Sequence, residues 1–196
     1  MKIILASSSK QRKDIFDMTG LKYEVIVSNA SEESKKTSPD KYVEEISLNK
    51  AKNVEKQICE KAIIISADTI IYKDNKIFGK PKTKKEAYSF LKELSNGKCS
   101  AYTGLTLIDL YKEKVISSSS KVDIYIKNIK EEELKWYIDN EEKIFKCCGF
   151  VPLGKGSLFI EKVEGDYNIL FGISPSIVYN KLKELGYSLD DLDFKK

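Results

Sequence analysis

The side chain best suited to chemistry in this sequence is Asp68, a carboxylate directly after the apolar run 62–66. A carboxylate at the end of a buried strand lies at the sheet edge where α/β proteins bind ligands, and there it can hold a divalent ion or position a water molecule. The alternative is an aspartate that only caps the next turn. Glu32, in a polar loop, offers a second oxygen ligand, although a loop glutamate is most often simply solvated.

The beginning of the chain offers a place for an anion. An apolar run at 3–5 is followed by small hydroxyl residues, among them Ser7 and Ser9, and then by a basic helical start with Arg12. This layout points backbone N–H groups and a positive helix end toward a ligand. A serine-capped helix with a solvated arginine explains the same residues. The segment is not a Walker A loop, because it has no glycine.

Two lysines and one glycine-rich segment complete the candidate site. Lys50 lies near the edge of an apolar helical face, and Lys80 stands between a glycine and a proline, where the proline stiffens the backbone beside it and suits a positioned charge. The segment 146–156 contains three glycines and one proline. Such a run can wrap around a flat ligand, and a plain connecting loop is an equally good interpretation.

Composition excludes several kinds of active site. The sequence contains no histidine, which excludes a Ser–His–Asp triad, a Cys–His pair and a His-ligated zinc. Its four cysteines form no C-x-x-C pattern, so we expect free thiols. Acid–base work must therefore fall to Asp, Glu, Lys, Tyr or Cys, and a metal would be a hard, oxygen-ligated ion such as Mg²⁺ or Mn²⁺.

The totals describe a globular protein with a mild preference for anions. The 196 residues fit one or two domains, and 34 basic against 30 acidic side chains leave a net charge of +4, too little to predict nucleic acid as a partner. No apolar run approaches the ~20 residues of a membrane-spanning helix, and no signal peptide is recognised. We expect a cytoplasmic protein with no membrane partner.

Hydrophobic periodicity and turn residues predict a mixed α/β fold. We expect a strongly twisted mixed sheet flanked by helices, in two lobes with a central cleft. The predicted helices cover 10–18, 38–59, 83–94, 131–139 and 174–186, and the predicted strands cover 3–5, 21–28, 62–66, 70–72, 76–78, 102–111, 115–126, 157–163 and 167–171.

Seven short motifs in the right order resemble the Maf (septum formation protein) family of nucleoside triphosphate pyrophosphatases, from end to end. The opening Leu5–Arg12 is similar to that family's L-A-S-x-S-P-R-R. The other motifs are Ser28–Glu32, Lys50-Ala51, Ala67-Asp68-Thr69, Gly79-Lys80-Pro81, Thr103-Gly104 and the stretch from Tyr137 through Glu142 to Lys146.

The resemblance implies one Maf-like domain over residues 1–196, similar in fold to inosine triphosphatases, that hydrolyses a nucleoside triphosphate to the monophosphate and pyrophosphate with Mg²⁺ or Mn²⁺. By position in the motifs, Glu32 and Asp68 would serve the metal and the attacking water, with Asp68 as the general base. Lys50 and Lys80 would offset charge on the triphosphate. The remaining implied substrate-binding residues are Ser7, Ser9, Arg12, Thr103 and Lys146.

The departures from the family pattern concern substrate preference. Gln11 replaces an arginine and Lys10 a proline, so one cationic phosphate contact is lost or moves to Lys10 or Lys13, and Ser31 stands where the family often has Asp. Leu153 replaces a glutamine associated with the dTTP/UTP branch, where the 7-methyl-GTP branch has glutamate. Leucine supplies neither hydrogen bond, which leaves the base preference open; a pyrimidine or modified nucleotide is our first choice.

Two other functions fit the same residues. One is a non-catalytic nucleotide- or nucleic-acid-binding regulator of cell division, and the other is a kinase or an NTPase that releases a single phosphate. The resemblance also implies a house-cleaning role or a link to division arrest, and it leaves a homodimer open.

Overall fold

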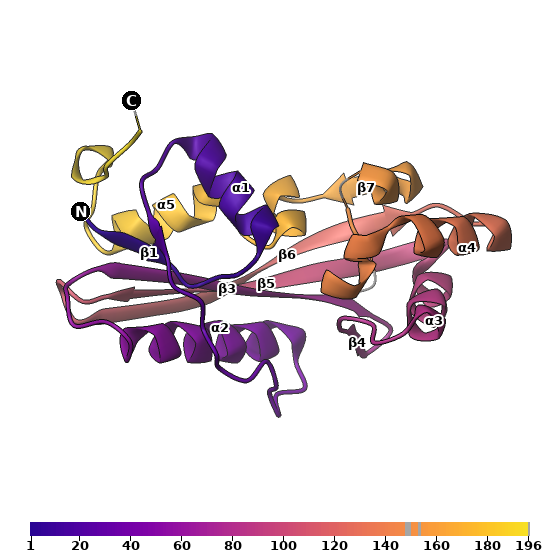
Figure 1. The fold of residues 1–196 in the computed structure, drawn as a ribbon, viewed down its shortest axis with the longest axis horizontal. Helices are drawn as coiled ribbons and strands as arrows, with labels where there is room; N and C mark the ends of the chain where they lie inside the picture. The colour runs from indigo at the N-terminus through magenta and orange to yellow at the C-terminus, as the bar shows by residue number, and fades with distance from the viewer. Residues whose placement is uncertain (148–149, 153, 196) are drawn as a thin grey trace. The chain divides into compact units, whose positions relative to one another are not determined.

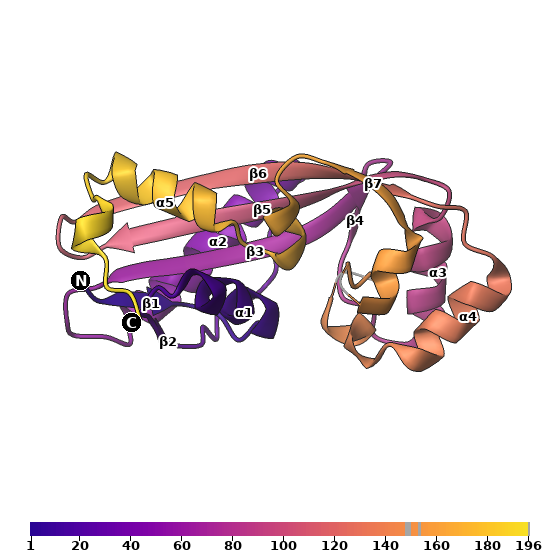
Figure 2. The ribbon, with the colours of Figure 1, turned by 90° about the horizontal axis from the view of Figure 1, so that it is seen from above.

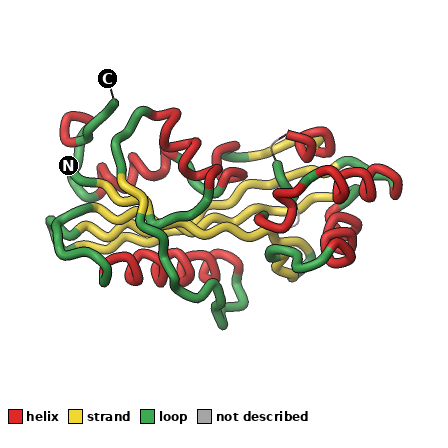
Figure 3. The backbone as a smooth tube through the Cα atoms, viewed as in Figure 1, coloured by secondary structure: helices red, strands yellow, loops and turns green. Residues whose placement is uncertain are grey.

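The computed structural model describes residues 1–147, 150–152 and 154–195 as a mixed α/β fold. Its seven-stranded sheet has the order β2-β1-β3-β5-β6-β7, and β4 pairs with β3 outside this path. The strands are β1 Ile3–Leu5, β2 Glu24–Val25, β3 Ile63–Lys73, β4 Lys76–Phe78, β5 Gly97–Asp109, β6 Lys114–Ile126 and β7 Ile160–Glu164. The α-helices are α1 Lys10–Thr19, α2 Pro39–Glu55, α3 Lys84–Leu94, α4 Glu131–Asn140 and α5 Pro175–Glu184 (Figures 1 and 3).

The pairing of the strands confirms the predicted mixed sheet. β1 lies parallel to both β2 and β3, whereas β4 is antiparallel to β3 and β7 is antiparallel to β6. The chain divides into two compact units. Unit 1 comprises 1–68, 103–120 and 171–196, and unit 2 comprises 69–102 and 121–170. The central cleft and the single functional domain stay predictions.

In unit 1, helices cover both faces of the sheet. Phe16 of α1 and Val178 and Leu182 of α5 share one apolar core with inward residues of β1, β3 and β5, while Ala51 and Val54 of α2 pack in a second core on the other face (Figures 1 and 2). β1 and the part of β3 in this unit are buried on both faces, which explains their nearly continuous apolar runs.

In unit 2, α3 packs against α4, and aromatic side chains fill the space around them. Phe78 meets Phe90 edge to face, and Tyr137 meets Phe159 in the same way. The fully buried Tyr137 accepts a hydrogen bond on its hydroxyl from the Val151 amide at 3.0 Å. Burial also raises the pKa of this phenol.

Local signals placed most elements correctly. α1 ends at Gly20, which adopts the left-handed conformation (φ 72°) as expected of a helix stop. The β3–β4 hairpin turns at Asp74-Asn75, both with positive φ, the geometry of a two-residue type I′ turn. Thr83 caps α3 by accepting from the Glu86 amide, although Glu86 returns its carboxylate to the Lys82 amide instead of to Thr83.

The largest errors in the predicted elements concern three strands. The strand expected to end at Ser66 continues to Lys73, because most of the residues beyond Ser66 stay buried in the sheet, so Asp68 lies within β3 and not after its end. Strand 21–28 is reduced to β2. The second half of the last hairpin, 167–171, is a 3₁₀-helix, because the Asp166 carboxylate accepts from the Asn168 amide and caps a helical turn.

Candidate active site

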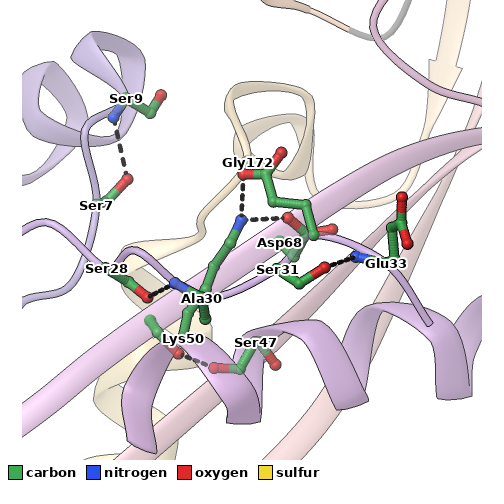
Figure 4. Close-up of polar contacts among 12 residues, drawn as sticks. Ser7, Ser9, Ser28, Ala30, Ser31, Glu33, Ser47, Lys50, Asp68 and Gly172 are labelled. Carbon is green, nitrogen blue, oxygen red and sulfur yellow. Dashed lines mark hydrogen bonds and ion pairs between the residues drawn. The ribbon is translucent and has the colours of Figure 1, made fainter. Parts of the chain in front are cut away.

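The candidate site in unit 1 centres on an ammonium group shared by two carboxylates. Lys50 Nζ lies 2.6 Å from Asp68 Oδ1 and 2.8 Å from Glu32 Oε1. Figure 4 shows the Lys50 side chain reaching from α2 toward Asp68. The Lys50 and Asp68 side chains are 10% and 12% exposed, whereas Glu32 is 51% exposed. The two acidic groups chosen from separate segments therefore converge on one point, which carries a net charge of −1.

α2 brings Lys50 to this point because its backbone lies very close to the sheet. A Cβ on Gly104 of β5 would be 2.1 Å from the Val43 carbonyl oxygen, so only glycine allows this approach. One helical turn before Lys50, Ser47 accepts from Ser66 Oγ through its carbonyl and shares a hydrogen bond with Thr106 Oγ1. These contacts fix the height and rotation of α2 over β3, and hence the position of the ammonium group.

Glu32 comes from a loop that lies along α2. At its beginning, the Asn29 amide donates to Asn53 Oδ1 at 2.9 Å, and Ser28 Oγ donates to the same oxygen at 3.3 Å. Farther on, Ser34 Oγ donates to Glu45, and the Tyr42 hydroxyl donates to the Glu32 carbonyl at 3.4 Å. Sequence reasoning missed Asn53, Tyr42 and Glu45, since polar residues on an amphipathic helix look like an ordinary solvated face.

A second cluster of candidate residues forms where β1 leads into α1. Ser7 Oγ accepts from the Ser9 amide at 3.1 Å, a contact drawn in Figure 4, and from Arg12 Nη1 at 3.4 Å. Ser9 caps α1 by accepting from the Arg12 amide. Arg12 Nε donates to the carbonyl of Gly172 at 2.9 Å, and Gly172 has φ 86°, a conformation that favours glycine. The predicted serine and arginine cluster therefore exists, and Gly172 is a partner the sequence did not reveal.

One of the residues that depart from the family pattern already has an ion-pair partner. Lys10, one of the two lysines considered as a replacement cation, forms an exposed i,i+4 ion pair with Asp14.

Thr103 is buried in β5, and strand alternation puts it on the face of α1 and α5, opposite Gly104.

The remaining predicted site residues lie in unit 2 or outside the described residues. Lys80 is exposed between β4 and α3, and Lys146 is the exposed last residue of the 3₁₀-helix Glu142–Lys146. Their roles toward the Asp68 cluster stay predictions. Leu153, on which the base preference depends, lies outside the described residues.

The chemistry of the cluster fits a hard divalent cation. Its two carboxylates already approach a single positive charge, and oxygen ligands suit Mg²⁺ or Mn²⁺. Among the described residues, no group of three or more His, Cys, Asp or Glu side chains could hold a metal. Mg²⁺ in proteins is typically held by one or two carboxylates, with substrate phosphates and water as further ligands. Glu32 and Asp68 match that pattern.

No helix in the described part of the chain has the length and apolarity needed to cross a membrane.

The profile of the family described as "Maf-like protein" matches residues 2–185. A dTTP/UTP pyrophosphatase of Thermoanaerobacter sp. (strain X514) is 39% identical over 183 residues, covering 93% of this chain and 96% of that protein.

Further relatives share the same name. A dTTP/UTP pyrophosphatase of Carboxydothermus hydrogenoformans is 35% identical, covering 95% of this chain and all of that protein, and one of Clostridium beijerinckii is 34% identical. A solved structure, the Staphylococcus aureus Ham1 protein, aligns at 14% identity and a TM-score of 0.44 over 64% of this chain and 72% of that chain, too low a likeness to support a conclusion.

Proposed function

The chain belongs to the Maf family, and from this membership we propose that it is an enzyme that hydrolyses a nucleoside triphosphate to the monophosphate and pyrophosphate. The relatives named dTTP/UTP pyrophosphatase align over nearly their whole length, which supports this activity. The single structural observation that supports it best is the convergence of Glu32 and Asp68 on Lys50.

The proposed reaction needs positive charge more than it needs a covalent intermediate. A triphosphate carries about four negative charges, and charge develops on the leaving pyrophosphate as the bond breaks. A divalent cation, held by Glu32 and Asp68 together with phosphate oxygens, would supply part of the compensating charge. Lys50 supplies a fixed ammonium beside the same carboxylates, and we assign Lys80 a similar role from its motif.

Asp68 is the proposed general base. Its carboxylate is nearly buried and lies beside the Lys50 ammonium, and we assign it to accept the proton of the attacking water molecule. Ser7, Ser9 and Arg12 would bind phosphate oxygens through hydroxyl, amide and guanidinium donors, exchanging some of their present mutual contacts for the ligand. Thr103 and Lys146 are further proposed substrate contacts.

The direct test is product analysis with a panel of canonical and modified nucleoside triphosphates, with Mg²⁺ and with Mn²⁺. We expect monophosphate and pyrophosphate in equal amounts, with dTTP and UTP as the first candidates. Formation of the nucleoside diphosphate would favour the other enzymes, a kinase if the terminal phosphate moves to an acceptor and an NDP-forming NTPase if it is released as free phosphate. Tight binding without any product would favour a regulatory binding protein.

The test of the base is Asp68→Asn, which keeps the shape of the side chain and removes its charge. We expect turnover to fall by about 10³-fold or more while the protein remains folded. Asp74→Asn is the matched control, because it makes the same chemical change in the exposed β3–β4 turn, where asparagine tolerates the positive φ. Near-normal hydrolysis by Asp68→Asn would remove Asp68 from this role.

Septum formation, a house-cleaning role, the cytoplasmic location and a homodimer stay predictions from the sequence.

A further inference from the structure

We propose that Asn53 and Glu45, two side chains of α2 with no reactive role of their own, are positioning residues that hold the Glu32 loop at both ends. The proposal rests on the proposed function, since it concerns the carboxylate assigned to the metal. It adds to the site two residues that lie outside the motifs by which the site was found.

Asn53 anchors the beginning of the loop through a single oxygen. Its Oδ1 accepts from the Asn29 amide at 2.9 Å, from Ser28 Oγ at 3.3 Å and from Gln57 Nε2 at 3.0 Å. Ser28 Oγ in turn accepts from the Ala30 amide at 3.1 Å, which tightens the next turn of the loop (Figure 4). The hydrogen bonds that hold the beginning of the loop therefore extend to Ala30, two residues before Glu32.

Glu45 anchors the other end. Its carboxylate accepts from Ser34 Oγ, which itself accepts from the Lys36 amide at 3.0 Å. Between the two anchors, the Tyr42 hydroxyl donates to the carbonyl of Glu32 itself. Since Tyr42, Glu45 and Asn53 all belong to α2, the helix that supplies Lys50 also positions the loop that supplies Glu32.

The physical need for such anchors follows from the exposure of Glu32. Its side chain is 51% exposed, and a glutamate in a free polar loop would lose rotamer and backbone freedom whenever it bound the cation. Anchors formed during folding remove most of that loss in advance. Without them, Glu32 would still be present, but it would lie over the cation only part of the time.

The first measurement is the Mn²⁺ dependence of pyrophosphate release by Asn53→Ala. We expect the Mn²⁺ activation constant to rise about 10-fold, the usual effect of removing a group that orients a ligand, with the nucleotide KM changed less than about twofold. Asn53→Asp keeps an oxygen acceptor for both loop donors and should restore most of the Mn²⁺ affinity. Gln57→Ala is the matched control, since it removes the partner of Asn53 that lies outside the loop.

The second measurement does not depend on turnover. Hydrogen exchange at the Asn29 amide should speed up in Asn53→Ala and stay unchanged in Gln57→Ala. Mn²⁺ binding without nucleotide, followed by electron paramagnetic resonance, should weaken in the same variant. If the wild-type protein released no pyrophosphate from any nucleotide, the proposed function would fail, and these two readings would still test the positioning role.

The proposal is overturned if Asn53→Ala and Gln57→Ala have the same Mn²⁺ dependence, or if Asn53→Asp is as impaired as Asn53→Ala. Should Asn53→Ala not fold, Ser34→Ala tests the other anchor from the loop side and leaves α2 intact. There too a raised Mn²⁺ constant supports the proposal, and an unchanged one contradicts it.

Discussion

Single residues at this site are defined by their neighbours, and Lys50 is the clearest case. In the sequence it is one of many lysines near the edge of a helical face. In the structure it is nearly buried and forms hydrogen bonds with two carboxylates. A buried charge needs such partners, because its desolvation costs several kcal/mol. Lys50 therefore supplies positive charge between Glu32 and Asp68, the two carboxylates that we propose as metal ligands.

This arrangement predicts the behaviour of Lys50→Met, which keeps an unbranched chain and removes the ammonium. The Asp68 and Glu32 carboxylates would then face each other without a counter-charge. We expect the variant to lose about 1–3 kcal/mol of stability in a metal-free buffer. We also expect Mn²⁺ without nucleotide to raise its Tm more than it raises that of the wild type. Differential scanning calorimetry with and without Mn²⁺ measures both effects.

Lys41→Met is the matched control for Lys50→Met. Lys41 belongs to the same helix and pairs with Glu44, but its side chain is 60% exposed, so its loss should change stability by less than about 0.5 kcal/mol. An equal response of the two variants to Mn²⁺ would show that the ammonium of Lys50 and the metal do not share a place.

Asp68 and Glu32 could be chosen from the sequence because each carries a local signal, the end of an apolar run for Asp68 and a family motif for both. It could not identify Asn53, Glu45 or Gly172. Their contribution depends on which loop lies against α2 and which carbonyl faces Arg12, and both follow from contacts between residues far apart in the chain. Partners of this kind carry no local signal in the types or spacing of residues.

At the level of elements, the contact between α2 and β5 is the most demanding. Gly104→Ala would bring a Cβ to 2.1 Å from the Val43 carbonyl oxygen, and backbone atoms cannot move aside without lifting α2. We expect a loss of about 2–4 kcal/mol in the free energy of unfolding, together with reduced turnover because Lys50 moves with the helix. Urea unfolding and steady-state kinetics measure the two effects.

Gly79→Ala is the control for this change. Nothing lies within 4 Å of a Cβ at Gly79, so the substitution tests the effect of a methyl group alone. It should change stability by less than about 0.5 kcal/mol. A stable Gly104→Ala variant with normal turnover would contradict the close approach of α2 to the sheet.

In unit 2, neighbouring strands β5 and β6 hold a carboxylate that makes stability depend on pH. Burial disfavours the charge of Asp123, but hydrogen bonds from Lys98, Ser100 and Lys121 outweigh it and lower the pKa to about 2. Because this pKa lies below the unfolded value near 4, the stabilisation is complete above about pH 4 and is lost as the pH falls toward 2.

Asp123→Asn tests this dependence. The variant should lose about 2 kcal/mol at neutral pH, and less and less relative to the wild type as the pH falls from 4 to 2. Urea unfolding followed by circular dichroism at a series of pH values gives the difference. If the difference in unfolding free energy stays constant from pH 7 to pH 2, the ionisation of Asp123 is not the cause of the pH dependence.

Elements were easier to predict than their ends. Helical periodicity, together with glycine stops and proline starts, placed every α-helix of the described chain within a few residues. The strand containing Asp68 was cut short because Ala-Asp-Thr looks like a turn, while the continuous pairing and burial of β3 overrule that local preference. The 3₁₀-helix 167–171 was missed because a single aspartate caps it. From residue types alone, such a cap cannot be distinguished from the turn of a hairpin.

At the scale of the whole chain, the last residues return to the beginning. Leu21 pairs with Phe194 in an antiparallel bridge, the Lys22 amide donates to the Asp193 carbonyl, and the Lys195 amide donates to the Gly20 carbonyl. These contacts join segments about 170 positions apart, and no periodicity in the sequence predicts them. The family profile ends at residue 185, before this segment begins.

The returning segment forms one side of an open apolar pocket of about 160 Å³, which α1 and α5 also line. Leu189, Leu192 and Phe194 line it from the tail, and Phe16 and Leu21 line it from the beginning of the chain. Removing residues 188–196 would expose these apolar side chains to water while keeping Tyr187, whose hydroxyl donates to the buried Asp109 at 3.0 Å. The cost is set by the partial burial of three large side chains, about 2–3 kcal/mol.

We therefore expect the variant that lacks 188–196 to melt roughly 4–10 °C lower and to bind more of the dye ANS than the wild type. The full-length variant Lys195→Ala, which removes only an exposed ion pair with Asp17, should melt within about 1 °C of the wild type. Turnover at low temperature should survive the deletion, because none of the candidate site residues belongs to the tail. An unchanged Tm would mean that the tail only rests on α1 and α5, and that the core of unit 1 is complete without it.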